Sequence, residues 1–379
     1  MSVRYISTSI FVYIPNSASI TNQGYRIDDA KTPGHPKAPS FPARPAEPRA
    51  LILAHIPRNK NPKLVVSIIN FRTADLTLQC IRSVLDDFDT IDGHIVVVDN
   101  NSGDGSADVI ANWIAEQPGP IPVTLVRSPT NSGFSGGHNQ GIGAREADYY
   151  LVLNSDALLK PGFCAAILQA ADASPKTGLF APRIDYESGE QQVNCFRFPG
   201  PVSELIRGAA TGPVTRLFRR YDMPLYPPPD PAEIDWASFA CILLRHEMVT
   251  ALGPMDEGYF LYFEDTEYCL RARRAGWSIA YVPEARAVHF RGGSGPVKQM
   301  AAEKKRMPGY YYASRSRFLY QAHGWFGLMA ANLLWVLGRS IAGLRLFAGK
   351  SVPKVSKAEM RDIWINALTP LGDRRDTGP

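Results

Sequence analysis

Short apolar runs alternate with amphipathic segments in the first half of the chain, and this alternation predicts an α/β fold. Runs rich in Val, Ile and Leu at 64–69, 95–98 and 123–126 predict buried strands, and a fourth run ends shortly before Asp156. Between the first two runs, apolar residues recur at helical spacing from Leu76 to Phe88. Strands that alternate with helices over short connections favour a mostly parallel central sheet flanked by helices, with right-handed crossovers.

Polar residues follow all four predicted strands. Asn70 and Asp99 end the first two, Asn131 follows the third, and Asp156 lies just past the fourth. The carboxyl ends of parallel strands lie at one edge of a sheet, where open α/β sheets bind their ligands. The sequence therefore predicts that these four side chains converge on one binding edge.

Asp156 is the carboxylate around which this edge is predicted to be organised. One hard oxygen ligand that faces a diphosphate is the minimum needed to hold Mg²⁺ or Mn²⁺ between protein and nucleotide. A turn aspartate that caps the helix predicted after Pro161 is an equally open interpretation. His289 and Arg291 precede a glycine-rich loop and are candidates for a metal ligand and a phosphate contact, although a lone His is more often structural.

The glycine-rich segment 131–141 allows the backbone to approach a nucleotide closely, or else forms a tight turn that packs a helix. It does not match the dinucleotide fingerprint, because Gly141-Ile142-Gly143 lacks the third glycine and follows the third strand instead of the first. The Walker A pattern is also missing, since the Gly-Lys-Ser at Gly349-Lys350-Ser351 has Leu344 where the pattern requires its first glycine.

Two acidic residues, Glu264 and Asp265, follow the apolar and aromatic segment 259–263 and precede a helix predicted at 266–275. A carboxylate at the edge of a pocket accepts a proton from a hydroxyl in the transition state, which makes Asp265 a candidate general base. Acidic residues at a helix start are also ordinary caps, so both roles stay open. Upstream, Trp236 to Leu244 predicts one further strand.

Composition restricts the class of protein only mildly. The net charge of +5 does not favour a nucleic-acid partner and is compatible with anionic ligands or an anionic membrane surface. The five cysteines are scattered without a Cys-x-x-Cys pair, which predicts buried free thiols in a reducing compartment.

In this order, the motifs resemble those of family 2 glycosyltransferases with a GT-A fold, in particular the bacterial rhamnosyltransferase-like branch of cell-surface polysaccharide assembly. The resemblance covers about residues 62–320. The motifs that carry it are 65–99, Asn131-x-Gly133-Phe134-x-x-Gly137-x-Asn139, Leu153-Asn154-Ser155-Asp156, Asp256-Glu257, Phe263-Glu264-Asp265, Arg271 and Ala275-Gly276-Trp277.

The resemblance implies an inverting, metal-dependent transfer of a hexose, with L-rhamnose from dTDP-rhamnose favoured over a UDP-sugar, to a lipid-linked or polysaccharide acceptor. It implies a Mg²⁺ or Mn²⁺ cofactor, and a cytoplasmic enzyme that is peripheral at the inner face of the cell membrane. Asp265 would be the catalytic base, and Asp156 and His289 the metal ligands. The nucleotide contacts would be Asn70, Asp99, Asn131, Gly133, Asn139 and Asn154, and the acceptor or diphosphate contacts Trp236, Glu264 and Arg291.

The chain departs from the family at Phe239, since Ser238-Phe239-Ala240 stands where the family usually has Ser-Gly-Ala. The added bulk lies near the expected acceptor site. A catalytically silent subunit that binds a nucleotide sugar within a polysaccharide pathway is therefore the alternative hypothesis. A nucleotidyltransferase is disfavoured, because Asn70-Phe71-Arg72-Thr73 supplies no basic, glycine-rich phosphate loop after the first strand.

Three regions are expected along the chain. Residues 1–60 form a Pro-rich, poorly ordered extension, with six prolines between residues 33 and 48. Residues 61–303 form the GT-A domain and residues 304–379 a helical region. The apolar block 324–338 has 15 residues, fewer than the about 20 that span a bilayer. It fits a membrane-interfacial helix or a helix that packs on the domain, and both interpretations stay open.

Overall fold

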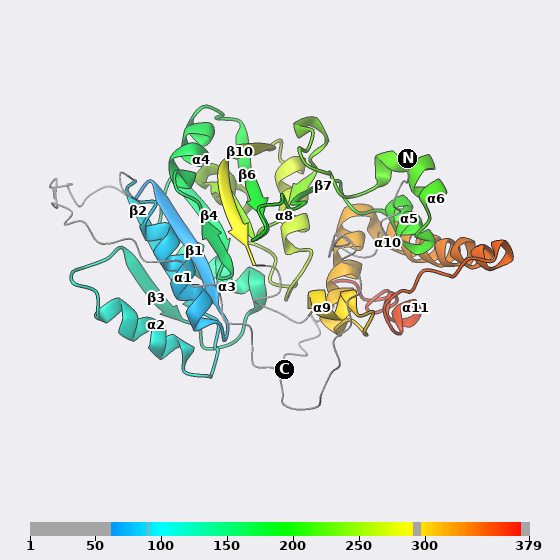
Figure 1. The fold of residues 1–379 in the computed structure, drawn as a ribbon, viewed down its shortest axis with the longest axis horizontal. Helices are drawn as coiled ribbons and strands as arrows, with labels where there is room; N and C mark the ends of the chain where they lie inside the picture. The colour runs from blue at the N-terminus through cyan, green and yellow to red at the C-terminus, as the bar shows by residue number, and fades with distance from the viewer. Residues whose placement is uncertain (1–61, 89–90, 291–296, 373–379) are drawn as a thin grey trace, which may run out of the picture. The chain divides into compact units, whose positions relative to one another are not determined.

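The computed structural model describes residues 62–88, 91–290 and 297–372, so the prediction for residues 1–60 lies outside the described residues. An eight-stranded sheet runs in the order β3-β2-β1-β4-β9-β6-β10-β5 (Figure 1). The strands β3, β2, β1 and β4 are all parallel, as predicted. The bounds are β1 Leu64–Asn70, β2 Gly93–Asp99, β3 Val123–Arg127, β4 Tyr149–Asn154, β5 Ala157–Leu159, β6 Thr177–Asp185, β9 Cys241–Arg245 and β10 Ser278–His289.

Helices cover both faces of the sheet because alternate strand residues point to opposite sides. On one face, Leu64, Val66 and Ile68 of β1 pack in a core with helices α1, α2 and α4. On the other face, Val65 packs in a core with α3, α7 and α8. The helix bounds are α1 Ala74–Leu85, α2 Ser106–Ala115, α3 Gly133–Gly143, α4 Phe163–Asp172, α7 His246–Leu252 and α8 Glu264–Arg274.

The strand predicted at 236–244 is broken in two. β8 (Trp236–Ala237) pairs with β7 (Cys195–Phe196), whereas β9 begins at Cys241 and pairs with β4. Between them, Ser238 N–H donates to the Asn194 carbonyl and the Ala240 carbonyl accepts from Asn154 N–H, at 2.9 Å in both cases. The apolar pattern did not reveal this break, since residues on both sides of it are buried.

The C-terminal part is dominated by the helix α10 (Gly309–Gly343), which has non-helical backbone angles at Gly324 (φ 70°, ψ −178°). It packs against α5 (Pro201–Ala209), and the approach is close because a Cβ on Gly338 would lie 2.5 Å from the Leu205 carbonyl oxygen. The remaining short helices are α6 Gly212–Leu217, η1 Arg219–Tyr221, η2 Pro231–Glu233, α9 Val297–Ala302, η3 Leu344–Ala348 and α11 Glu359–Asp362.

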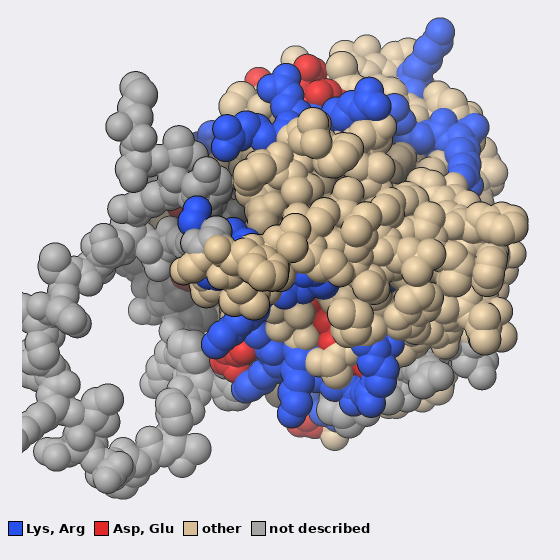
Figure 2. Space-filling model, turned by 90° about the vertical axis from the view of Figure 1, so that its right-hand side faces the viewer, with Lys and Arg blue, Asp and Glu red and all other residues tan. Residues whose placement is uncertain are grey.

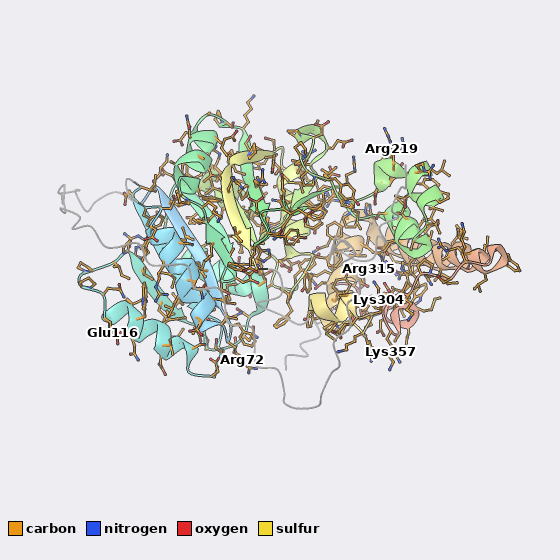
Figure 3. The ribbon with its side chains drawn as sticks, in the orientation of Figure 1. Arg72, Glu116, Arg219, Lys304, Arg315 and Lys357 are labelled. Carbon is orange, nitrogen blue, oxygen red and sulfur yellow. The ribbon has the colours of Figure 1, made fainter. Side chains whose placement is uncertain are left out.

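A buried ionic network joins α5, α10 and α11. Glu204 accepts from Arg207 at 2.6 Å and from Arg315 at 2.8 Å, and Arg207 also pairs with Glu359. The two arginines balance the two carboxylates and hold the pKa of Glu204 down to about 2 despite its burial. In Figure 3, Arg315 lies among the helices whereas Arg219 and Lys357 lie at the periphery. The network fixes the inner face of α10.

Candidate active site

A pocket of about 540 Å³ opens at the carboxyl ends of β1 and β4. Its lining comes from segments far apart in the sequence: the loop after β1, the start of α3, the end of β4, the break between β8 and β9, the segment 260–266, His289 and the start of α10. Seven of the predicted site residues line it, namely Asn131, Gly133, Asn154, Trp236, Glu264, Asp265 and His289.

Asn70 and Asp99 lie beside the pocket and organise the ends of β1 and β2. The two residues are register partners, and Asn70 Nδ2 donates to Asp99 Oδ1 at 2.7 Å. Asp99 also accepts from the Ser102 hydroxyl at 2.5 Å and from the Ser102 N–H at 3.2 Å. Both side chains are buried. The structure therefore shows them shaping the loops at the pocket edge, and direct nucleotide contact stays a prediction.

Asn131 and Gly133 form the pocket rim at the start of α3. Asn100 Nδ2 donates to Asn131 Oδ1 at 3.1 Å and to the Gly133 carbonyl at 2.9 Å. Gly133 has φ +72°, and a Cβ there would lie 2.2 Å from the carbonyl oxygen of Phe260. Glycine is required for this close contact, which holds α3 against the segment that leads to Glu264 and Asp265.

Asn139 lies six residues after Gly133 on α3 and contacts a different partner. Its side chain exchanges two 2.9 Å hydrogen bonds with the backbone of Met255 and donates to Glu257 at 3.0 Å. It is not among the residues that line the pocket. In this structure Asn139 ties α3 to the loop before the acidic pair, and its contact with nucleotide stays a prediction.

Asp156 and His289 are adjacent in space. β5 pairs with β10 in a register that places Ala157 opposite His289, and Phe290 N–H donates to the Asp156 carbonyl at 2.8 Å. His289 Nε2 consequently lies 3.2 Å from Asp156 Oδ1 and 3.4 Å from Asn154 Nδ2. Arg291, the predicted phosphate contact, lies outside the described residues.

The Asp156–His289 pair suits a divalent ion that completes its coordination with phosphate. Within residues 62–88, 91–290 and 297–372, no three His, Cys, Asp or Glu side chains form a group that would hold a metal ion. Mg²⁺ and Mn²⁺ sites in nucleotide enzymes commonly use one or two protein ligands and take the rest from substrate phosphates and water. One carboxylate and one imidazole beside a pocket fit this description.

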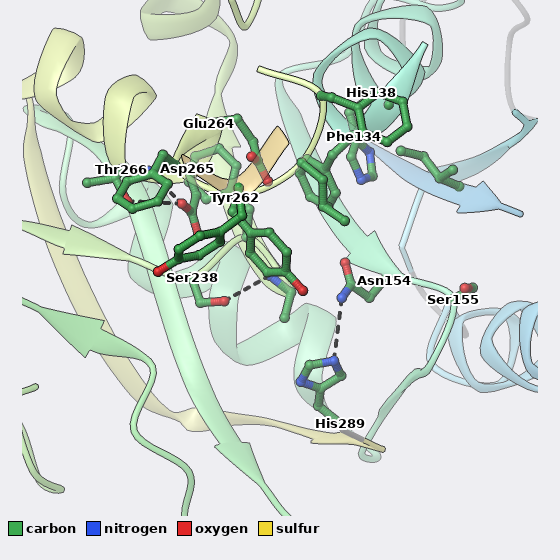
Figure 4. A pocket seen from close by; sticks show the side chains of 18 of the residues that line it. Phe134, His138, Asn154, Ser155, Ser238, Tyr262, Glu264, Asp265, Thr266 and His289 are labelled. Carbon is green, nitrogen blue, oxygen red and sulfur yellow. Dashed lines mark hydrogen bonds between the residues drawn. The ribbon is translucent and has the colours of Figure 1, made fainter. Parts of the chain in front are cut away.

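Glu264 and Asp265 lie on the side of the pocket across from Asn154 and His289 (Figure 4). Asp265 Oδ1 accepts from Thr266 N–H at 2.7 Å and from the Thr266 hydroxyl at 3.1 Å. Burial raises the pKa of Asp265 to about 6, although these hydrogen bonds oppose the shift. Burial, together with the charge of Asp265, raises the pKa of Glu264 well above its usual range. The pair therefore combines a carboxylate whose pKa is raised to about 6 with a neighbour whose pKa is also raised.

The backbone before this pair is strained. Tyr262 and Phe263 have φ values of 71° and 70°, in the left-handed region that residues other than glycine rarely adopt. Each such residue costs about 1–3 kcal/mol, and such costs persist where packing enforces them, often at functional sites. Phe263 is held by rings of α10, with centroids 5.7 Å from Tyr311 and 5.9 Å from Phe318. The C-terminal helix thus fixes the conformation that presents the acidic pair.

Two protein-family models match this chain. The model described as "Glycosyl transferase family 2" matches residues 65–210, and that described as "Glycosyltransferase like family 2" matches residues 231–310. The chain belongs to glycosyltransferase family 2. Its mostly parallel sheet with flanking helices is the GT-A fold, and the protein is a glycosyltransferase.

Two relatives and one solved structure that resemble this glycosyltransferase are themselves sugar transferases. An N-acetylglucosaminyl-diphospho-decaprenol L-rhamnosyltransferase of Mycobacterium tuberculosis is 29% identical over 271 residues, which cover 65% of this chain and 80% of the relative. A low-salt glycan biosynthesis hexosyltransferase of Haloferax volcanii is 26% identical over 59% of this chain and 66% of its own. A solved mannosyltransferase of Pyrobaculum calidifontis, in complex with GDP-Man and Mn²⁺, is 13% identical with a TM-score of 0.47 over 77% of each chain.

Two aromatic side chains that line the pocket of this glycosyltransferase, Trp236 and Phe239, are also packed into its core. Trp236 Nε1 donates to the Arg197 carbonyl at 3.1 Å, and its ring stacks on Phe196 at 4.3 Å. Phe239 is 1% exposed, with its ring edge-on to Tyr268 at 6.0 Å. The bulk of Phe239 is therefore accommodated in the core.

His138 is a pocket residue that the sequence did not identify. It is fully buried on α3, lines the pocket beside Phe134, and its Nδ1 lies 2.9 Å from the Ser67 hydroxyl. Its Nε2 has no hydrogen-bond partner among the described residues. Burial lowers the pKa of His138 to about 3, so the ring is neutral. A histidine within a glycine-rich segment, four residues after Phe134, was the available signal.

Proposed function

We propose that this glycosyltransferase moves L-rhamnose from dTDP-rhamnose to a lipid-linked glycan acceptor, with inversion at the anomeric carbon. The observation that carries the proposal is that Asp265 and the metal-ligand candidate His289 line one pocket. The sugar and the acceptor are supported by the M. tuberculosis relative, whose name specifies L-rhamnose and a diphospho-decaprenol acceptor. We place the reaction in the cytoplasm, at the inner face of the cell membrane, where a lipid-linked acceptor is accessible.

In the proposed mechanism, Asp265 takes the proton of an acceptor hydroxyl while that oxygen attacks the anomeric carbon. The bond between this carbon and the diphosphate oxygen breaks, and the nucleoside diphosphate leaves from the opposite face. A bound Mg²⁺ or Mn²⁺ would neutralise the charge that develops on the leaving diphosphate. Asp156 and His289 would hold the ion, and Asn70 and Asp99 shape the edge that receives the nucleoside.

The direct experiment supplies dTDP-rhamnose and N-acetylglucosaminyl-diphospho-polyprenol to the purified full chain with Mn²⁺. We expect a rhamnosylated lipid, detected by mass spectrometry. NMR should show that the anomeric configuration of the rhamnose in this product is opposite to that in the donor. Transfer from a UDP-hexose alone would keep the mechanism and change the donor. Tight dTDP binding without transfer to the lipid acceptor or to a polysaccharide would favour the silent binding subunit instead.

The rate of transfer is expected to rise with pH through about 6, because only ionised Asp265 accepts a proton and its pKa is about 6. The contribution of Asp265 to folding stability changes in the opposite direction to the rate. Because folding raises the pKa of Asp265, the folded state binds more protons than the unfolded state between about pH 4 and 6. The contribution of this group to stability therefore falls as pH rises through that range. Single-turnover rates from pH 5 to 8, with thermal unfolding at each pH, measure both. A rate that falls across pH 6 would contradict the assignment.

His138→Leu is expected to weaken binding of the donor by about 2–10-fold, because one neutral hydrogen bond contributes about 0.5–1.5 kcal/mol. Calorimetry with dTDP-rhamnose and with dTDP alone locates the lost contact: a loss only for the sugar nucleotide places His138 at the sugar. His246→Gln, outside the pocket, is the control. Unchanged affinity for both ligands would exclude His138 from the binding site.

A further inference from the structure

The second half of α10 exposes an apolar row on its outer side. Phe326 is 83% exposed, Leu333 60%, Leu337 49% and Leu344 60%. The three leucines follow Phe326 by 7, 11 and 18 positions. At ~100° per residue, all four lie within about 20° of one line along the helix. The row crosses from α10 into η3 at Leu344, the first residue of η3, and continues to Leu346 and Phe347, which are 65% and 90% exposed.

The opposite side of the same helix is buried against the rest of the protein. Leu328, Ala331 and Trp335 are fully buried, and the backbone of Trp335 lies against Gly208 of α5. The helix is therefore apolar on two sides, and only the inner side has a partner among the described residues. The exposed face of a helix in a soluble protein normally carries polar residues. An apolar row on that face therefore indicates an interaction site.

Basic residues border this row. Residues 325–357 contain five Arg or Lys and no Asp or Glu, and residues 212–221 contain three Arg and no acidic residue. Figure 2 shows this side of the molecule as a broad uncharged band whose two edges carry many Lys and Arg and fewer Asp and Glu. An apolar strip between basic margins complements the acyl chains and anionic headgroups of a lipid bilayer.

We propose that the outer row of α10 and η3, defined by Phe326, Leu333, Leu337, Leu344, Leu346 and Phe347, docks this glycosyltransferase on an anionic lipid surface. The inference deepens the proposed function and rests on its lipid-linked acceptor. The same helix packs Tyr311 and Phe318 against Phe263, so the docked element is also the one that supports the acidic pair. Docking would set the pocket at a fixed height above the lipid.

The helix lies on the bilayer instead of spanning it. The segment Gly309–Phe347 is long and apolar enough to cross a membrane by length and composition. However, Asn332 accepts from Arg315 at 2.8 Å, and Arg339 donates to the carbonyls of Gly208 and Pro353. Spanning would separate these groups from their partners and place them in hydrocarbon, which is costly. Only the outer row is free to enter the headgroup region.

The test is flotation of the purified full chain with vesicles of phosphatidylcholine, with and without phosphatidylglycerol. We expect binding that requires the anionic lipid. The variant Phe326→Ser/Leu333→Gln/Leu337→Gln should lose binding, whereas the matched variant Phe326→Trp/Leu333→Met/Leu337→Met should keep it. Replacing Arg345, Lys350 and Lys354 by Gln should lower the partition coefficient roughly a hundredfold, since each basic residue at an anionic surface contributes about a factor of five.

The outcomes separate docking from the proposed function. All variants should bind dTDP like the wild type in calorimetry, because none of the altered residues lines the pocket. Wild-type protein that does not float, or a polar variant that floats equally, would overturn docking and leave the donor chemistry untouched. If the wild type sediments as a dimer, the polar variant sediments as a monomer and neither binds vesicles, the row is an interface with a second copy of the chain. Resistance to alkaline extraction from membranes would indicate a spanning helix, and either result contradicts the proposal.

Discussion

Asp265→Asn is expected to lower kcat for sugar transfer by roughly 10²–10⁴-fold, the usual contribution of a positioned general base. The asparagine keeps the size of the side chain and cannot take the acceptor proton. Because Asp265 lies across the pocket from Asn154 and His289, the affinity for dTDP should stay close to that of the wild type. We therefore expect the substitution to lower kcat and to leave the affinity for the donor nucleotide nearly unchanged.

Glu267→Gln is the control for this variant. Glu267 lies in the first turn of the same helix, and its carboxylate pairs with Arg271 at 2.6 Å. It does not line the pocket, so its replacement should leave kcat within about twofold, provided that the protein stays folded. A value for Asp265→Asn within a factor of two of the wild type would remove Asp265 from the role of base.

Asp156→Ala is expected to abolish the metal-dependent part of dTDP binding, a loss of more than about a hundredfold in affinity. Asp156 is 1% exposed and its Oδ1 lies 3.2 Å from His289 Nε2, so this variant removes the carboxylate of the candidate metal-binding pair. The loss should exceed the roughly 10–100-fold that removal of an outer partner of a metal site costs. Calorimetry with and without EDTA measures it.

Ser155→Ala is the matched control, because it changes the preceding residue and spares the carboxylate. Its hydroxyl lies 3.2 Å from that of Thr73, and losing one such contact should cost about tenfold at most. Donor affinity and metal dependence that survive Asp156→Ala would show that this carboxylate does not organise the site.

The sequence predicted the parallel half of the sheet because each strand is a short apolar run followed by a polar residue. β1, β2, β3 and β4 all occur where these runs lie. The structure also confirms that the strand ends meet: Asn70 and Asp99 are hydrogen bonded, and Asn131 is joined to Asn100, which follows Asp99. Local pattern was sufficient here because parallel strands bring their ends to one edge without further information.

The rest of the site depends on contacts that no local pattern encodes. The three-residue strand β5 is too short to show periodicity, yet its pairing with β10 brings His289 to Asp156. The break at Ser238–Ala240 is concealed by apolar residues on both sides. The Nε2 atom of His138 is left without a hydrogen-bond partner among the described residues because the fold buries this side chain on α3 against Ser67. Each of these features arises from long-range packing.

The metal-dependent donor site is tested most directly by calorimetric titration of the wild-type protein with dTDP and with UDP, each with Mn²⁺ and again with EDTA. We expect binding that requires the metal and is tighter for dTDP than for UDP. Binding of dTDP that EDTA leaves unchanged, or no binding of either nucleotide in the presence of Mn²⁺, would contradict it.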